Sequence, residues 1–228
     1  MEKLVYVISQ EASVPGADLR AALIEKAAPA LRVAGASRIS VNVSDEEVAA
    51  GAGVVISRSS PPIRAMVSFW MENSDDRAPC EEALGQTAAA LAGYLVVESR
   101  PLLHEPPLGK RAPGANLVTC VNKLPDISYE TFFDRWNNEH KQVATEIQST
   151  FAYVRNAVLR KLTPDAPDRD GIVEESFPID ALTNPKVWYD CDSDEELGRR
   201  VQRMLDSVNA FLDLGPLEST PMSEYYLG

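Results

Sequence analysis

The chain has 228 residues, enough for one large domain or two small ones, and its 45% hydrophobic and 25% charged residues are typical of a globular protein. The 22 Lys and Arg against 34 Asp and Glu give a formal net charge of −12, and the absence of a basic run argues against binding to nucleic acid. No segment reaches the roughly 20 apolar residues that span a bilayer, and the N-terminus lacks the apolar region of a signal peptide. We therefore expect a cytoplasmic protein that does not associate with membranes.

The three cysteines, Cys80, Cys120 and Cys191, are odd in number and lie far apart, which suits free thiols in a reducing compartment. No group of His, Cys, Asp and Glu has the spacing of a zinc or iron site. Neither a glycine-rich nucleotide-binding motif nor a Gly-x-Ser-x-Gly motif is present. We expect neither a metal nor a cofactor.

The first hundred residues alternate between strand-like and helix-like patterns. They predict, in order, a strand, a helix, two strands, a helix and a strand, at 3–9, 17–34, 37–43, 63–71, 76–92 and 94–99. Pro29 lies inside the first helical pattern and is expected to kink that helix or end it early, because proline has no backbone N–H to donate. The order β-α-β-β-α-β is that of a ferredoxin-like unit.

A segment with four prolines, 101–114, follows and is predicted to be a linker. The same order of elements then recurs, with strands at 116–122, 151–160, 170–177 and 218–226, helices at 128–149 and 193–212, and a helical turn at 179–185. Pro221 is expected to confine the last strand to a sheet edge or a bulge. We therefore divide the chain into a first half (1–100), a linker (101–115) and a second half (116–228).

The recurrence predicts an old internal duplication, in which the two halves can be aligned by their chemistry. The aligned positions are Leu23 with Trp136, Ala27 with His140, and the tetrapeptide ISVN at 39–42 with YVRN at 153–156. The first half thus has Leu and Ala where the second half has Trp and His. We expect the first half to be a structural partner with a degenerate site.

The stretch 129–156 is the strongest candidate for carrying chemistry. Its first part has apolar residues every three or four positions, as in an amphipathic helix that begins after an N-cap at Ser128. Trp136 and His140 are four residues apart and share one face of that helix. Histidine exchanges protons readily near neutral pH, so this face would suit an acid–base pocket. Core packing explains the same pair without any catalytic role.

The Trp-x-x-x-His motif followed by the strand Tyr153-Val-Arg-Asn156 resembles the signature of the EthD family, within the dimeric α+β barrel superfamily. The segment DGIVE at 170–174 is similar to that family's third-strand motif, and FLD at 211–213 is similar to its late Phe-x-Asp. The family usually carries a His directly after the Asn, where this chain has Ala157. A second proton relay is therefore not expected here.

The resemblance implies an α+β fold in which two ferredoxin-like sheets cover each other's apolar faces and form a barrel. Here one chain carries both halves, so we predict an intramolecular version of the dimeric α+β barrel. We expect a pocket between each sheet and its own helices. We leave open whether the fused chain also forms a homodimer.

The candidate catalytic residues are His140, Tyr153 and Asn156, and the candidate substrate-binding residues are Phe133, Trp136, Arg155, Glu174 and Trp188. Strand alternation places Tyr153 and Arg155 on one face and Asn156 on the other, so Tyr153 and Asn156 cannot line one pocket without a bulge. The other histidine, His104, lies in the linker and is interpreted as incidental.

The leading hypothesis is a cofactor-independent lyase, that is, a dehydratase, a decarboxylase or an enzyme of related C–O or C–C cleavage. It would act on a small aromatic or polyketide-like compound, with His140 as general base and acid and either Tyr153 or Asn156 donating to the oxyanion that forms. One alternative is a non-catalytic accessory or small-molecule-binding protein of an oxygenase system. Another is an oxygenase or peroxidase, either cofactor-free or with His140 as a haem ligand.

Overall fold

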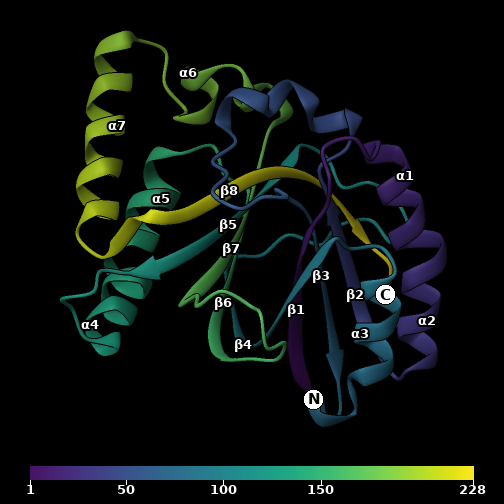
Figure 1. The fold of residues 1–228 in the computed structure, drawn as a ribbon. Coiled ribbons are helices and arrows are strands. Elements are labelled where there is room, and N and C mark those ends of the chain that lie inside the picture. Colours follow the sequence, from purple (N-terminus) through teal and green to yellow (C-terminus); the bar gives the residue numbers. More distant parts are fainter.

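The computed structural model describes all 228 residues. Eight strands form the centre of the molecule, and helical segments lie on the outside (Figure 1). The strands are β1 (Glu2–Ser9), β2 (Ser37–Val43), β3 (Ile63–Met71), β4 (Ala90–Leu102), β5 (Ala115–Lys123), β6 (Ala152–Lys161), β7 (Gly171–Phe177) and β8 (Leu212–Tyr226). The helical segments of the first half are α1 (Gly16–Ala21), η1 (Ala22–Ala27), α2 (Ala28–Val33), η2 (Glu46–Val54), η3 (Ser74–Asp76) and α3 (Ala78–Gly85). Those of the second half are α4 (Tyr129–Asp134), η4 (Arg135–His140), α5 (Lys141–Ile147), η5 (Ile179–Leu182), α6 (Pro185–Trp188) and α7 (Asp194–Asn209).

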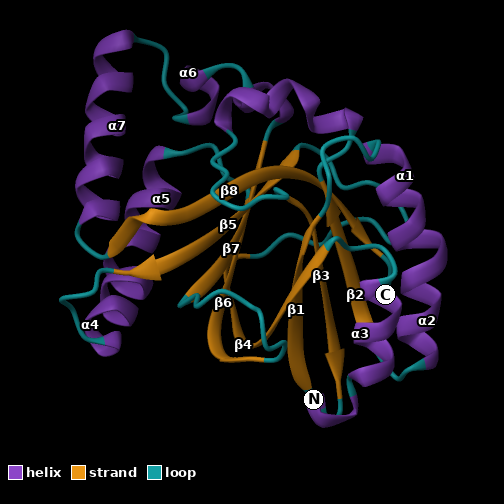
Figure 2. Cartoon of the chain, viewed as in Figure 1, coloured by secondary structure: helices purple, strands orange, loops and turns teal.

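The strands close into one antiparallel barrel in the order β1-β3-β2-β8-β5-β7-β6-β4. The last strand of each half joins its own first strand to the other half, because β4 pairs with both β1 and β6, and β8 pairs with both β5 and β2. The helices lie outside the strands, with α1 to α3 over the first half and α4, α5 and α7 over the second (Figure 2). The predicted intramolecular α+β barrel is confirmed.

Strand alternation sorts the side chains into layers. On β1, Leu4, Tyr6 and Ile8 pack with the helices of the first half, whereas Val5 and Val7 pack inside the barrel with Ile172 of β7. A third cluster lies between the second sheet and its helices and includes Phe132, Trp136, Tyr153, Met204 and Phe211. The barrel interior and the two sheet–helix layers are therefore three separate regions.

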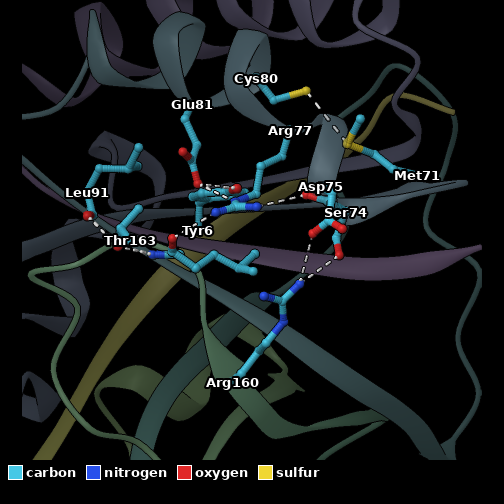
Figure 3. Close-up of polar contacts among 12 residues, drawn as sticks. Tyr6, Met71, Ser74, Asp75, Arg77, Cys80, Glu81, Leu91, Arg160 and Thr163 are labelled. Carbon is cyan, nitrogen blue, oxygen red and sulfur yellow. Dashed lines mark hydrogen bonds and ion pairs between the residues drawn. The ribbon is translucent and has the colours of Figure 1, made fainter.

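Polar contacts reinforce the seam where β4 meets β6. Arg160 Nη2 lies 3.3 Å from both Ser74 Oγ and Asp75 Oδ1, and Thr163 Oγ1 donates to the carbonyl of Leu91 at 3.2 Å (Figure 3). Arg77 follows η3 in the first half and donates to the carbonyl of Leu162 at 3.1 Å. These contacts tie the first half to the end of β6 in the second half.

The first helix of each half contains a π-helical segment, η1 in one half and η4 in the other. Leu23 and Ala27 occupy the same positions in η1 that Trp136 and His140 occupy in η4, as the alignment of the halves predicted. Pro29 neither ends nor interrupts the helical run, which continues to Val33. It stands in the first turn of α2, directly after the wider π turn, where a missing N–H is tolerated.

Several predicted boundaries are wrong. The second helix ends at Gly85 because β4 already begins at Ala90, and β8 begins at Leu212, well before the predicted 218. Pro221 does not mark an edge, since a closed barrel has none. It is tolerated because the ladder between β2 and β8 covers only the residues from Ser223 onward.

The linker is held against β8. The amide of Gly109 donates to the carbonyl of Tyr226 and the amide of Ala112 donates to the carbonyl of Glu224, both at 2.8 Å. The Arg111 guanidinium donates to the Ser223 hydroxyl at 2.9 Å. The linker is thus fixed beside one end of the barrel. None of the helices is both long and apolar enough to cross a bilayer.

Candidate functional site

Three predicted residues meet in the layer between the second sheet and its helices. The Trp136 indole donates to the Tyr153 hydroxyl at 3.1 Å, and both side chains are fully buried. The Arg155 guanidinium lies 5.8 Å from the ring centroids of both and donates to the Trp136 carbonyl at 3.2 Å. Burial raises the pKa of the Tyr153 phenol, so it is protonated at neutral pH.

Glu175 faces the same layer, directly opposite Tyr153 in the β6–β7 ladder. One of its carboxylate oxygens is buried without a hydrogen-bond partner, and burial raises the pKa of this carboxyl to about 7. Glu175 was not among the residues predicted from the sequence. It adds an ionisable group to a layer in which apolar and aromatic side chains surround Arg155.

His140 is packed between helices. Its Nδ1 lies 2.9 Å from the Ser207 hydroxyl of α7, and its ring centroid lies 5.0 Å from that of Phe211. Burial, with a smaller contribution from the Arg155 charge, lowers the pKa of the imidazole to about 4, so it is neutral at pH 7. A haem ligand needs a wide, flat space beside the ring nitrogen that binds iron. His140 does not line any of the three cavities described for this structure, so its surroundings give no support for a haem.

Two predicted substrate-binding residues lie apart from this group. Phe133 is 42% exposed on the outer face of α4, beside a wide hollow of about 860 Å³ that is formed by that helical surface alone. Trp188 stacks on Phe177, with ring centroids 4.2 Å apart. The structure thus brings together Trp136, Tyr153 and Arg155, and separates Phe133 and Trp188 from them.

The last two predicted residues, Asn156 and Glu174, point into the barrel, as strand alternation requires for Asn156. The Asn156 amide donates to Glu174 at 2.9 Å and its carbonyl oxygen accepts from Lys3 Nζ at 2.8 Å. Lys3 Nζ also lies 2.5 Å from Glu98 and 3.6 Å from Glu174. The side chains of Lys3, Glu98, Asn156 and Glu174 are buried or largely buried. The Lys3 ammonium lies among the two carboxylates and the amide oxygen.

A cavity of about 570 Å³ lies at this end of the barrel interior, which is within the size range of small-molecule sites. Its lining comes from both halves and from the linker, and its polar members include Lys3, Arg38, Ser40, Ser68, Glu98, Arg100, His104, Glu105, Asn116, Glu174, Ser176 and Glu224. The other end of the interior is filled by apolar side chains such as Val5, Met66 and Met222. The predicted pocket between sheet and helices is thus replaced by a polar cavity inside the barrel.

The cavity repeats the duplication of the chain. Asn156 of β6 stands opposite Glu98 of β4, and Asn42 of β2 stands opposite Glu224 of β8. Asn42 and Asn156 are both fully buried and both contact Glu174, at 3.5 and 2.9 Å. Each half therefore supplies one glutamate of these two pairs to the cavity lining, and the asparagine opposite it is buried behind the lining.

One difference between the two sides lies near the start of each half. The first strand of the first half carries Lys3, whereas the first strand of the second half carries Asn116, whose amide donates to Asn42 at 2.9 Å. Glu98 therefore receives an ammonium. Glu224 receives only the Ser40 hydroxyl at 3.4 Å, and the Asn116 carbonyl oxygen is buried without a partner.

This difference separates the pKa values of the two glutamates. Burial acts to raise the pKa of Glu98, but Lys3 and Arg100 hold it below its ordinary value. Burial, together with the nearby charge of Glu174, raises the pKa of Glu224 to about 7. One carboxyl is thus ionised at neutral pH while its counterpart is poised to exchange a proton.

Lys3, Glu98 and Glu224 were not predicted from the sequence, and His104 was interpreted as incidental. One signal was available, because Lys3 shares a strand face with Val5 and Val7, which marks a charge that points into an apolar layer. His104 lines the cavity, and its Nε2 is buried without a partner. No group of three or more His, Cys, Asp and Glu side chains is placed to hold a metal ion.

Comparison with known proteins supports the fold. Residues 124–207 match the EthD domain. The whole chain is similar to the crystal structure of an anthrone oxidase-like protein (11% identity, all of this chain and 93% of that chain, TM-score 0.59). It is also similar to the structure of a candidate chlorite dismutase (11% identity, all of this chain and 95% of that chain, TM-score 0.50). No curated protein sequence matches the chain.

At these identities the two structures establish likeness of fold alone. The segment that matches the EthD domain holds the Trp136–His140 motif and the strand that follows it. Residues 124–207 are thus similar to the EthD domain, and the chain as a whole is similar in fold to the anthrone oxidase-like α+β barrel structure.

Proposed function

We propose that this protein is a cofactor-independent acid–base enzyme of the lyase type, and that it binds a small aromatic or polyketide-like compound inside the barrel. Glu224 is the group that moves the proton. The observation that carries the proposal is the pairing of a cavity of about 570 Å³ with a lining carboxyl whose pKa is raised to about 7.

Glu224 suits this role because a general base works best when its pKa lies near the working pH. The ionised form would remove a proton from a C–H or O–H group of the compound. The protonated form would then return the proton to the oxygen of the leaving group, so that a C–O bond breaks and the carboxylate is regenerated. Glu98 is less suited, since Lys3 and Arg100 hold it in the ionised state.

His140 is a weaker candidate than Glu224. With a pKa of about 4 it is a poor base, and its Nδ1 and one ring face are engaged by Ser207 and Phe211. Tyr153 and Arg155 belong to the same layer and do not line the barrel cavity. Asn156 and Glu174 remain in the proposal as residues that hold Lys3 and orient the cavity's hydrogen bonds.

The test is solvent deuterium exchange. Small hydroxylated aromatic acids and β-keto compounds are incubated with the protein in D2O, and deuterium incorporation at carbon, together with any product, is followed by NMR and mass spectrometry. The wild-type protein should promote exchange or cleavage of at least one compound, and Glu224→Gln should slow it by about 10²- to 10⁴-fold.

Glu195→Gln on the exposed face of α7 is the matched control, because it makes the same chemical change far from the cavity. Binding without exchange or product in the wild type would favour the non-catalytic small-molecule binder. Equal activity in the wild type and Glu224→Gln would refute the role of Glu224.

A further inference from the structure

The open end of the barrel cavity carries positive charge in an acidic chain. Arg38, Arg100 and His104 line it together with Trp70, and Glu105 is the one carboxylate among the linker residues there. Arg38 forms no ion pair, and Arg100 uses only its Nε, which donates to Glu98 at 2.7 Å. Since the whole chain has a net charge of −12, a rim with two partly unpaired guanidinium groups is a local exception.

The backbone at Arg38 is held in an unusual conformation. Its φ is +50°, in the left-handed region that non-glycine residues rarely adopt. It lies where the β2–β3 register shifts, between Ser37 and Ser40, and such bulges re-aim side chains. The result is that the guanidinium stands 5.6 Å from the centroid of the Trp70 ring at the mouth of the cavity.

The inner end of the cavity carries hydrogen-bond acceptors that lack donors. The Asn116 carbonyl oxygen is buried without a donor, and Glu224 on the neighbouring strand β8 has only one long hydrogen bond. Both groups would accept from a hydroxyl. A ligand that satisfies both ends carries an anionic group at one end and a hydroxyl at the other.

We infer that the barrel cavity takes a hydroxylated aromatic carboxylate, with its carboxylate on Arg38 and Arg100 and its hydroxyl toward Asn116 and Glu224. The Trp70 indole at the mouth offers an aromatic neighbour for the ring. His104 also lines the cavity at the end where Arg38 and Arg100 lie, and its Nε2 is buried without a hydrogen-bond partner. This inference rests on the proposed site and names the class of compound that it accepts.

The experiment is isothermal titration of the full-length protein with 4-hydroxybenzoate and with 4-hydroxybenzamide, which has the same shape and no charge. The acid should bind at least about tenfold more tightly than the amide, because a guanidinium binds a carboxylate more strongly than a neutral amide. In the double variant Arg38→Gln, Arg100→Gln the preference should fall to about onefold. Arg199→Gln with a second change, Arg203→Gln, on exposed α7 makes the same change of net charge and should leave the preference intact.

Three results would overturn the inference: equal binding of the acid and the amide to the wild type, no binding of either, or the same loss of preference in the α7 control. The outcome is separable from that of the exchange assay. If Glu224→Gln leaves exchange unchanged while the rim variant abolishes the preference for the acid, the rim assignment stands and the catalytic role fails. If Glu224→Gln abolishes exchange while the rim variant has no effect, only the rim assignment fails.

Discussion

The two sides of the barrel cavity each pair a glutamate with an asparagine, but the pKa values of the two glutamates differ. On one side Glu98 faces Asn156 and forms an ion pair with Lys3, and on the other Glu224 faces Asn42 and forms no ion pair. The frame around them is a duplicated one, down to the π-helical segment in the first helix of each half. The cations beside one glutamate, Lys3 and Arg100, keep it ionised, whereas its counterpart, which forms no ion pair and lies near Glu174, has a raised pKa.

The largest expected effect comes from breaking the paired side. Lys3→Met should lower the free energy of unfolding by about 3–5 kcal/mol, because it leaves Glu98 and Glu174 buried beside each other without their cation. Urea denaturation at pH 7 measures this. Lys26→Met on the exposed surface of η1 is the matched control and should change stability by less than about 0.5 kcal/mol. A similar small loss for Lys3→Met would mean that the ion pair has no structural role.

A smaller effect is expected from making the two sides alike. Asn116→Lys places an ammonium where Lys3 stands in the first half, so the pKa of Glu224 should fall from about 7 to below its ordinary value. Carbon-13 NMR titration of the glutamate carboxyls measures the pKa directly. The same variant should lose exchange activity at pH 7, since its carboxylate would be a weaker base. An unchanged titration of Glu224 would contradict the proposed equivalence of the two sides.

Much of the fold could be predicted from sequence because its determinants are local. The β-prone runs of β1 and β3, the N-cap at Ser128, whose hydroxyl accepts from the Thr131 amide, and the recurrence of the β-α-β-β-α-β order each depend on neighbouring residues. Element ends were less predictable. Strand β8 continues through Pro216 and Pro221. On one side of the strand these positions need no backbone N–H, because no partner strand accepts a hydrogen bond from them there.

The candidate site could be predicted only in part. Trp136, Tyr153 and Arg155 come together as their spacing indicated, because they lie within one helix–strand unit. The partners of His140 come from α7 and the turn after it, and the cavity partners of Asn156 and Glu174 come from β1 and β4. Those contacts depend on barrel closure between strands far apart in the chain, and no local pattern reports which charged side chain will face which.

The smallest expected effect concerns stability as a function of pH. The folded protein holds the proton of Glu224 more tightly than an unfolded chain does, with a pKa of about 7 against an ordinary value of 4.5. This group therefore contributes stability that is present below pH 4.5 and is lost as pH rises to about 7. Glu175 contributes in the same direction, and His140, whose pKa is lowered to about 4, contributes stability that is lost as pH falls from 6.5 to 4.

Replacing Glu224 by Gln removes one of these contributions and leaves the other two. Between pH 5 and pH 8 the wild type should lose about 2 kcal/mol more unfolding free energy than Glu224→Gln does. Urea denaturation at the two pH values measures the difference, with Glu195→Gln as the exposed control. Glu175→Gln should likewise reduce the loss of unfolding free energy between the two pH values, through the sheet–helix layer. The double variant Glu224→Gln, Glu175→Gln then tests whether the two regions titrate independently. Parallel pH profiles for the wild type and Glu224→Gln would show that the carboxyl is already ionised near pH 5, and the contrast between the two sides of the cavity would disappear with it.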